Sequence, residues 1–526
     1  MHTKRYNLPS MKRYLLFTVF ISGMTTLAAE LAAGRLIGNV FGTSNIVWAS
    51  IIGLILIYLT LGYFLGGKWA DANPTPVAMY RVLAWGAFTL GLVPYIASPV
   101  LRAAATAFDT LQVGILGASF IAVLVLFIVP ITLLGTISPY AIRLLVDDTS
   151  HAGQTSGQIY SISTLGSFIG TFIPTLITIP TLGTKNTFLL FSMILLIVAL
   201  IGLTICGSSK ELLKHLWMPI ILIALSFLTA NQSMKASAQQ IYETESAYNY
   251  IEVVQFDGYN ILRLNEGQGQ HSIYKPGVFQ YNGPWDQFLV GPYFYANRKP
   301  SDIKRVAIVG LAAGTTARQM TAVYMDIPID GYELDPKIVE VGKKYFDMNM
   351  PNLNVIIGDG RLSLEKSKYK YDIIAVDAYR PPYIPPHMTT QEFFEICASH
   401  LTEDGVLTIN SASIPGDRRL INGLATTMAT IFPSIYTVDI PGSLNTMIFA
   451  TKQKTTSENF AINLLALSQD PSINPLLVST MQITFAKLHT GYEATTVFTD
   501  DRAPIEWIVN DMVMRFILTG GIEKLN

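Results

Sequence analysis

The chain has 526 residues, of which 50% are hydrophobic and only 14% are charged. Soluble domains usually carry about 25% charged residues, so this composition excludes a single water-soluble enzyme domain. Residues 1–235 hold 13 basic and 6 acidic residues, whereas the remainder holds 23 basic and 31 acidic ones. Nucleic acid binding requires clustered lysine and arginine, so we expect no nucleic-acid partner for the acidic second part.

Long apolar runs fill the first 230 residues. A helix needs about 20 apolar residues to cross a hydrocarbon core about 30 Å thick. The sequence therefore predicts a multi-pass cell-membrane protein whose membrane domain spans residues 1–235 and contacts the lipid bilayer. About seven membrane-spanning helices are expected, near 14–34, 45–66, 82–97, 114–137, 158–179, 187–206 and 216–230.

A small β-rich domain is predicted for residues 236–300. Alternating polar and apolar residues indicate strands at 251–256 and 260–264, which are joined by Asp257 and Gly258. An Asp-Gly pair between two such runs is typical of a tight hairpin turn. We therefore expect a small β layer in front of the next domain.

From residue 301 to 453 the pattern becomes strand, loop and helix, repeated. Short apolar strands that alternate with amphipathic helices are typical of a parallel sheet covered on both faces, so we expect a Rossmann-like α/β domain. Residues 454–526 are expected to form a helical extension. The predicted strands lie at 306–310, 329–334, 354–359, 371–377 and 405–410, with two more near 434–440 and 446–452.

Three successive strand ends carry residues suited to a nucleoside. Gly310 to Gly314 form a small-residue loop before a helix, where backbone amides can approach a ligand. Glu333 ends the second strand, from which a carboxylate can accept hydrogen bonds from two ribose hydroxyls. Asp359, followed by Gly360, ends the third strand and is placed to meet an adenine amino group. No P-loop lysine follows the glycines, so a nucleoside triphosphate is disfavoured.

Asp377 ends the fourth strand and precedes a proline-rich loop. A carboxylate at this position can hold an amine or take its proton during attack on an electrophilic carbon. The alternative is an ordinary capping aspartate. The seven histidines share no ligand spacing with carboxylates or cysteines, so we expect no metal.

Taken together, the sequence resembles the spermidine synthase family of polyamine aminopropyltransferases, in the subgroup fused to a multi-span membrane region. The motifs that carry the resemblance include LGYFLGGKWAD, GPWDQFLVGPYF, VAIVGLAAGTTARQM, YELDPKIVEVGKKYF, YDIIAVDAYRPPYIPPHMTTQEFF and TDDRAPIEW. The resemblance implies polyamine biosynthesis by a methyltransferase-like Rossmann domain behind a small β domain, with decarboxylated S-adenosylmethionine as donor. It also allows a homodimer through the synthase-like domain.

The resemblance further assigns roles to single residues. It implies Asp377 as the base, Glu333 on the ribose and Asp359 near the adenine. The other cofactor-binding residues that it implies are Gly310, Ala312, Gly314, Gly360 and Gln270, and the acceptor residues are Tyr379, Arg380, Trp285, Asp286 and Gln287.

Three departures from the family pattern concern substrate charge. Ala313 replaces an acidic residue of the glycine loop, and Trp285 to Gln287 replace a Tyr-His-Glu stretch. Arg380 stands where the family has a second aspartate that holds the diamine. A guanidinium there would repel a cationic polyamine, so a zwitterionic or anionic acceptor competes with a simple amine.

We predict a membrane-anchored transferase that moves an aminopropyl or other alkyl group from an S-adenosyl sulfonium to an amine-type acceptor. A second hypothesis is a methyltransferase that uses intact S-adenosylmethionine, since Ala313 leaves room for the methionine carboxyl. A third is a transporter with a ligand-sensing synthase-like domain, for which solute uptake would survive loss of Asp377.

The side of the membrane that holds the catalytic domain depends on two opposing arguments. Nine basic residues lie on the side of the N-terminus and three lie opposite, which predicts a cytoplasmic N-terminus. Seven spans would then place the catalytic domain outside, away from the cytoplasmic supply of S-adenosyl compounds. Because the run at 216–230 is short, we favour an even number of crossings and a cytoplasmic catalytic domain.

Overall fold

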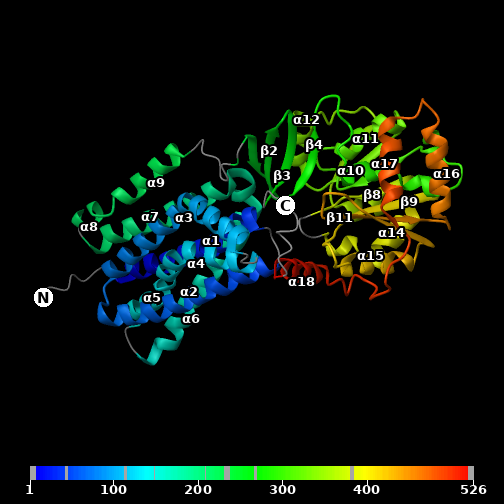
Figure 1. The fold of residues 1–526 in the computed structure, drawn as a ribbon. Coiled ribbons are helices and arrows are strands. Elements are labelled where there is room, and N and C mark those ends of the chain that lie inside the picture. Colours follow the sequence, from blue (N-terminus) through cyan, green and yellow to red (C-terminus); the bar gives the residue numbers. More distant parts are fainter. Residues whose placement is uncertain are drawn as a thin grey trace. The chain divides into compact units, whose positions relative to one another are not determined.

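The computed structural model describes residues 8–41, 45–111, 115–146, 149–207, 209–229, 237, 239–265, 269–379 and 384–518. The chain divides into two compact units (Figure 1). The helical unit comprises residues 1–238, 243–250 and 265–267, and the α/β unit comprises residues 239–242, 251–264 and 268–526.

The helical unit is built from long apolar helices (Figure 1). Within the described residues, six helical stretches are long and apolar enough to cross a membrane. Prolines inside α3 and α4 are tolerated because neighbouring helices can satisfy the freed backbone groups. The helices are α1 (Leu8–Phe41), α2 (Asn45–Ala72), α3 (Pro76–Leu111), α4 (Ile115–Gly135), α5 (Ile137–Leu145), α6 (Ala152–Ile173), α7 (Ile179–Cys206), α8 (Ser209–Leu213) and α9 (Trp217–Leu228).

One of the six stretches, Ala152–Cys206, contains two helices. It has 55 residues, and at 1.5 Å per residue a single helix of that length would measure about 80 Å, far more than a bilayer core. A π-helical turn, Pro174–Thr178, follows α6, and Gly183 has a non-helical φ of 80°. The stretch is therefore interrupted between α6 and the main part of α7.

Contacts with α1 give the directions of these two helices. A Cβ on Gly166 would lie 2.1 Å from Phe20 O, and one on Gly170 would lie 2.1 Å from Met24 O. Both residue numbers rise together, so α6 runs parallel to α1. Glycine is required at these positions because the two backbones touch.

The second helix runs the other way. Tyr14 OH donates to Val198 O at 2.7 Å, and Cys206 Sγ lies 3.5 Å from Met11 Sδ. Because the residue numbers of α7 fall as those of α1 rise, α7 is antiparallel to α1 and to α6. When α6 and α7 are counted separately, the described residues contain seven candidate membrane-spanning helices.

The end of α9 lies at the same end of the helical unit as the C-terminal end of α1. Lys185 Nζ donates to Thr229 O at 2.7 Å, which joins the end of α9 to the start of the main part of α7. Glu245 accepts from Thr184 N at 2.7 Å and from Asn39 Nδ2 at 2.8 Å. Thr229 and Glu245 therefore lie at the end of the helical unit opposite the one that holds Met11.

A four-stranded sheet has the order β1-β2-β3-β4. Its central hairpin turns at Asp257 and Gly258, whose φ angles of 49° and 77° match a two-residue turn with two positive φ values. The predicted hairpin is confirmed. The strands are β1 (Gln240–Glu245), β2 (Tyr250–Phe256), β3 (Tyr259–Leu264) and β4 (Gln270–Tyr274).

An eight-stranded sheet forms the centre of the α/β unit, with the order β12-β10-β11-β9-β8-β5-β6-β7. The strands from β9 to β7 are parallel, as predicted, and β10 and β11 form an antiparallel hairpin beside β9. The strands are β5 (Val306–Val309), β6 (Ile329–Glu333), β7 (Leu353–Ile357), β8 (Tyr371–Val376), β9 (Leu401–Ala412), β10 (Ser434–Asp439), β11 (Asn445–Thr451) and β12 (Leu488–His489).

Both faces of this sheet are buried. Ala307 and Val309 of β5 belong to one apolar cluster, whereas Val306 and Ile308 belong to another. This alternation makes the Rossmann-like, methyltransferase-type sheet a three-layer structure. The covering helices are α10 (Pro284–Gln287), α11 (Thr315–Tyr324), α12 (Pro336–Tyr345), α13 (Gly360–Glu365), α14 (Gln391–His400), α15 (Arg419–Ala429), α16 (Ser457–Ser468), α17 (Pro475–Ala486) and α18 (Ile505–Leu518).

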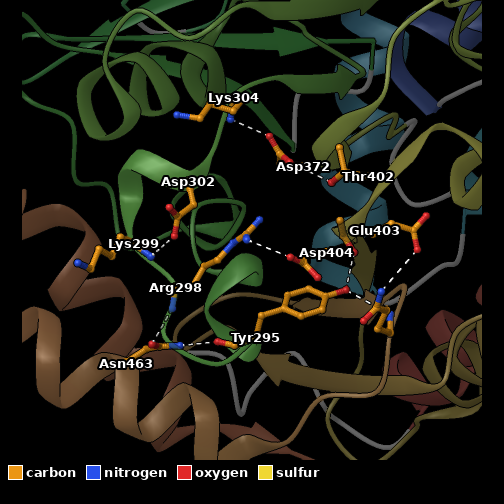
Figure 2. A network of polar contacts seen from close by, with 12 residues as sticks. Tyr295, Arg298, Lys299, Asp302, Lys304, Asp372, Thr402, Glu403, Asp404 and Asn463 are labelled. Atoms are coloured by element: carbon orange, nitrogen blue, oxygen red, sulfur yellow. Dashed lines mark hydrogen bonds and ion pairs between the residues drawn. The ribbon is translucent and has the colours of Figure 1, made fainter.

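Polar contacts tie together the segments around the amino-terminal ends of the parallel strands (Figure 2). Asp372 at the start of β8 accepts from Lys304 N at 2.7 Å and from Thr402 Oγ1 at 2.9 Å. Arg298 forms an ion pair with Asp404 at 3.3 Å. These residues fix the edge of the sheet that lies opposite the predicted nucleoside site.

Candidate active site

The structure brings the predicted strand ends to one edge of the sheet. At the carboxyl ends of the parallel strands, in the order β7-β6-β5-β8, lie Asp359, Glu333, Gly310 and Asp377. Val309 is in register with both Tyr332 and Val376. In open α/β sheets, ligands bind outside the carboxyl ends of such strands.

The loop after β5 has a backbone that only small residues can follow. Gly310 and Gly314 have φ angles of 91° and 81°, and the non-glycine Ala312 has a φ of 48°. Positive φ at a non-glycine residue is strained and is concentrated at functional sites. A Cβ on Gly310 would lie 2.5 Å from Ala378 N and 2.6 Å from Asp377 O, so the loop directly adjoins the end of β8.

Glu333 is fixed against this loop. Its Oε2 accepts from Ala312 N at 2.8 Å, and its Oε1 accepts from Asp335 N at 3.0 Å. Burial raises the pKa of Glu333 to about 7, although the two amide donors oppose the shift. Each carboxylate oxygen can accept a second hydrogen bond, which is the capacity that a pair of ribose hydroxyls requires.

Asp359 lies at a sheet edge that also carries exposed apolar side chains. Its Oδ1 accepts from Leu362 N at 2.9 Å and caps α13, and its Oδ2 lies 3.3 Å from His387 Nε2. Leu334, Ile357 and Leu362 are 44%, 55% and 49% exposed. A carboxylate beside apolar surface suits the amino group and the flat faces of a purine.

Asp377 is held by a chain of two asparagine amides. Its Oδ1 accepts from Asn410 Nδ2 at 2.9 Å, and Asn410 Oδ1 accepts from Asn445 Nδ2 at 2.9 Å. Burial raises the pKa of Asp377 to about 7, whereas the bond from Asn410 lowers it. A carboxylate with this pKa can exchange a proton near neutral pH.

The predicted acceptor residues have mixed outcomes. Arg380 lies outside the described residues, and Tyr379 packs at the margin of the apolar cluster beneath the sheet. Gln270, predicted as a cofactor contact, is exposed on β4 opposite Arg263.

Trp285, Asp286 and Gln287 lie in α10 and are buried. Asp286 accepts from Asn282 N at 2.8 Å and from Gln319 Nε2 at 2.5 Å, and burial raises its pKa. Gln287 Oε1 accepts from a threonine hydroxyl of α17 at 2.6 Å. The hydrogen bonds described for the side chains of Asp286 and Gln287 are therefore made to other residues of the protein.

Sequence reasoning missed His387, Asn410 and Asn445. Asn410 follows the apolar core of β9, so the strand-end rule applied to one more strand would have found it. Where the chain is described, no group of three or more His, Cys, Asp or Glu side chains could hold a metal ion.

Residues 295–463 match the Spermine/spermidine synthase domain family. A probable polyamine aminopropyl transferase of Bifidobacterium longum is 32% identical over 278 residues, which cover 50% of this chain and 61% of that protein. A polyamine aminopropyltransferase of Vibrio vulnificus is 27% identical over 212 residues, which cover 38% of this chain and 68% of that protein.

Among solved structures, a probable spermidine synthase from Corynebacterium glutamicum is similar, with 18% identity and a TM-score of 0.38. The match covers 49% of this chain and 96% of that one. The fold assignment follows from the strand order of the eight-stranded sheet. The residues that match the Spermine/spermidine synthase domain family therefore lie in the α/β unit, and the helical unit precedes them in the chain.

Proposed function

We propose that this protein is a membrane-anchored transferase that moves an aminopropyl group from decarboxylated S-adenosylmethionine to an amine-type acceptor. The observation that carries the proposal is the direct contact between the glycine loop and Asp377. The backbone of Asp377 lies within 2.6 Å of a Cβ built on Gly310, so a base and a nucleoside loop share one edge. Residues 1–235 would anchor the domains at 236–300, 301–453 and 454–526.

The residues present fit an S-adenosyl nucleoside. Glu333 would hold the ribose, Asp359 would meet the adenine amino group, and the backbone of Gly310 to Gly314 would line the nucleoside. The exposed side chains of Ile357 and Leu362 would flank the base. When bound, the donor supplies a carbon made electrophilic by its sulfonium group.

Asp377 would orient the acceptor amine and take its proton. As the new N–C bond forms and the C–S bond breaks, the amine proton passes to the Asp377 carboxylate and the thioether leaves. Asn410 holds one carboxylate oxygen, so the other remains for the acceptor. This division of roles follows from the hydrogen-bond capacity of a carboxylate.

Methylation by intact S-adenosylmethionine is a second candidate because Ala313 replaces an acidic residue. The structure adds that Ala313 is fully buried among Ile338, Val341 and Phe346 and that its amide donates to Ser272 Oγ at 2.9 Å. Its methyl group therefore packs against apolar neighbours, and the Arg318 guanidinium donates to Ala313 O at 3.2 Å.

We expect free putrescine to be a poor acceptor. Arg380 replaces the second carboxylate, and a guanidinium pairs with carboxylate or phosphate groups, so a zwitterionic acceptor should react faster. Rates for putrescine and for a set of amino-acid acceptors, measured on the purified protein, test this expectation. An Arg380→Asp variant should reverse the preference. Efficient conversion of putrescine to spermidine by the wild-type protein would refute it.

We further propose that the helical unit crosses the cell membrane and that the catalytic domain lies on its outer side. Seven membrane crossings would place the chain after α9 on the side of the membrane opposite the N-terminus. The positive-inside rule supports a cytoplasmic N-terminus. The cytoplasmic supply of S-adenosyl compounds, taken alone, favours a cytoplasmic catalytic domain. Together the number of crossings and the positive-inside rule support an outer catalytic domain, so the proposal includes a transport step for a donor made inside.

Reporter fusions after Lys214 and after Asn526 test the sidedness. We expect the Lys214 fusion to report a cytoplasmic position and the Asn526 fusion an outer one, because α9 separates them. Two cytoplasmic reporters would mean that α9 does not cross, and would return the catalytic domain to the cytoplasm.

A further inference from the structure

The acidic segment TDDRAP has no role in the site described so far. Thr499 and Arg502 pair as an antiparallel bridge, with Thr499 N donating to Arg502 O at 3.1 Å and Arg502 N donating to Thr499 O at 2.9 Å. Asp500 and Asp501 therefore lie at the tip of a tight turn. We call residues 499–502 the acidic turn.

Asp500 forms a two-pronged ion pair with Arg361. The two terminal nitrogens of Arg361 donate to Asp500 Oδ1 and Oδ2, each at 2.7 Å. Thr390 Oγ1 also donates to Asp500 Oδ1, at 2.8 Å. The hydrogen bonds from Arg361 hold the pKa of Asp500 below its usual value. Such paired geometry adds directional specificity to charge attraction.

Arg361 connects this turn to the predicted adenine end of the site. It follows Asp359 by two residues in α13, and it donates to His387 O at 2.9 Å. The ring of His387 lies 3.3 Å from Asp359 Oδ2. One guanidinium thus joins the end of β7, the loop after β8 and the acidic turn.

The loop after β8 is attached to the site at both ends. It begins at Asp377, beside the glycine loop, and it reaches Asp359 at His387. Tyr379 and Arg380, the predicted acceptor residues, lie between these two attachment points in the sequence. Asp377 and His387, which flank this loop, are therefore both held by contacts at the predicted site.

We propose that Asp500, at the tip of the acidic turn, belongs to the donor site, where it acts through Arg361 as a positioning residue that fixes His387 against Asp359. The proposal rests on the proposed function, because it takes Asp359 as the residue that meets the adenine. The ion pair is only partly buried, with Arg361 19% and Asp500 43% exposed in their side chains.

Asp500→Asn and its neighbour Asp501→Asn give a matched pair of variants of the full-length protein. Methylthioadenosine is the probe, and calorimetry gives its affinity. We expect Asp500→Asn to weaken binding by roughly 5- to 30-fold, less than the loss of a direct charge-assisted contact would, because Asp500 acts through Arg361. Asp501→Asn keeps the Arg361 pair and should bind as the wild type does. Both variants should unfold within a few degrees of the wild type.

Hydrogen exchange on the ligand-free protein provides a readout that needs no donor. Asp500→Asn should speed exchange at the amides of Met388 and Thr389, which follow His387, and Asp501→Asn should not. Unchanged exchange in Asp500→Asn would overturn the proposal whatever the donor is. Faster exchange with unchanged affinity would remove the turn from the donor site. If the wild-type protein binds no methylthioadenosine while Asp500→Asn still speeds exchange, the proposed function is rejected and, with it, the donor part of this inference.

Discussion

Asp377→Asn is expected to lower the rate of group transfer by about 10² to 10⁴, the usual cost of losing a general base. The amide keeps the shape of the side chain and can still bond to Asn410, so the fold and nucleoside affinity should be retained. Turnover and methylthioadenosine affinity, measured on the same preparation, separate the two effects. Full turnover in this variant would mean that the base lies elsewhere.

The pH dependence of the wild-type rate gives a second check on Asp377. The base acts when deprotonated, and its pKa is raised to about 7, so the rate should rise with pH through about 7 and then level off. Asn410→Leu removes the bond that lowers this pKa, so its rising limb should move to higher pH. A rate that is flat from pH 6 to 8 in both proteins would contradict this role.

Glu333→Ala should weaken nucleoside binding by at least tenfold. The variant loses the proposed ribose bonds, and charge-assisted hydrogen bonds are each worth about 1.5 to 3 kcal/mol. It also frees the amides of Ala312 and Asp335, which hold the loop in its strained conformation. Calorimetry on the full-length protein measures the affinity.

The matched control for this prediction is Glu340→Ala. Glu340 lies in α12, one helix after Glu333, and its side chain is 66% exposed and paired with Lys337. Its removal takes away the same charge and the same number of atoms without touching the glycine loop, so affinity should not change. Equal affinities for the two variants and the wild type would remove Glu333 from the site.

Local sequence patterns predicted the residues at the strand ends, because each of these residues comes at the end of a short apolar run. Gly310, Glu333 and Asp377 could be placed in this way, since parallel strands bring their carboxyl ends to one edge. The same patterns could not predict the ion pair between Arg361 and Asp500, because 139 residues separate them. Contacts of this kind depend on how loops fold back over the sheet.

The apolar runs predicted where the helices lie in the sequence, but they did not predict the directions in which α6 and α7 run. The antiparallel arrangement of α6 and α7 follows from close contacts at Gly166 and from the bond between Tyr14 and Val198. Likewise, composition alone could not show that Asp286 is bonded internally to Gln319. Tertiary packing determines both features.

The nucleoside product of the reaction tests the central claim most directly. The purified full-length protein is incubated with decarboxylated S-adenosylmethionine, or with S-adenosylmethionine, and a mixture of amine and amino-acid acceptors, and the nucleoside is identified by mass spectrometry. Aminopropyl transfer predicts methylthioadenosine from the decarboxylated donor, with its formation lost in Asp377→Asn. S-adenosylhomocysteine from the intact donor, with no methylthioadenosine from the other, would contradict the account.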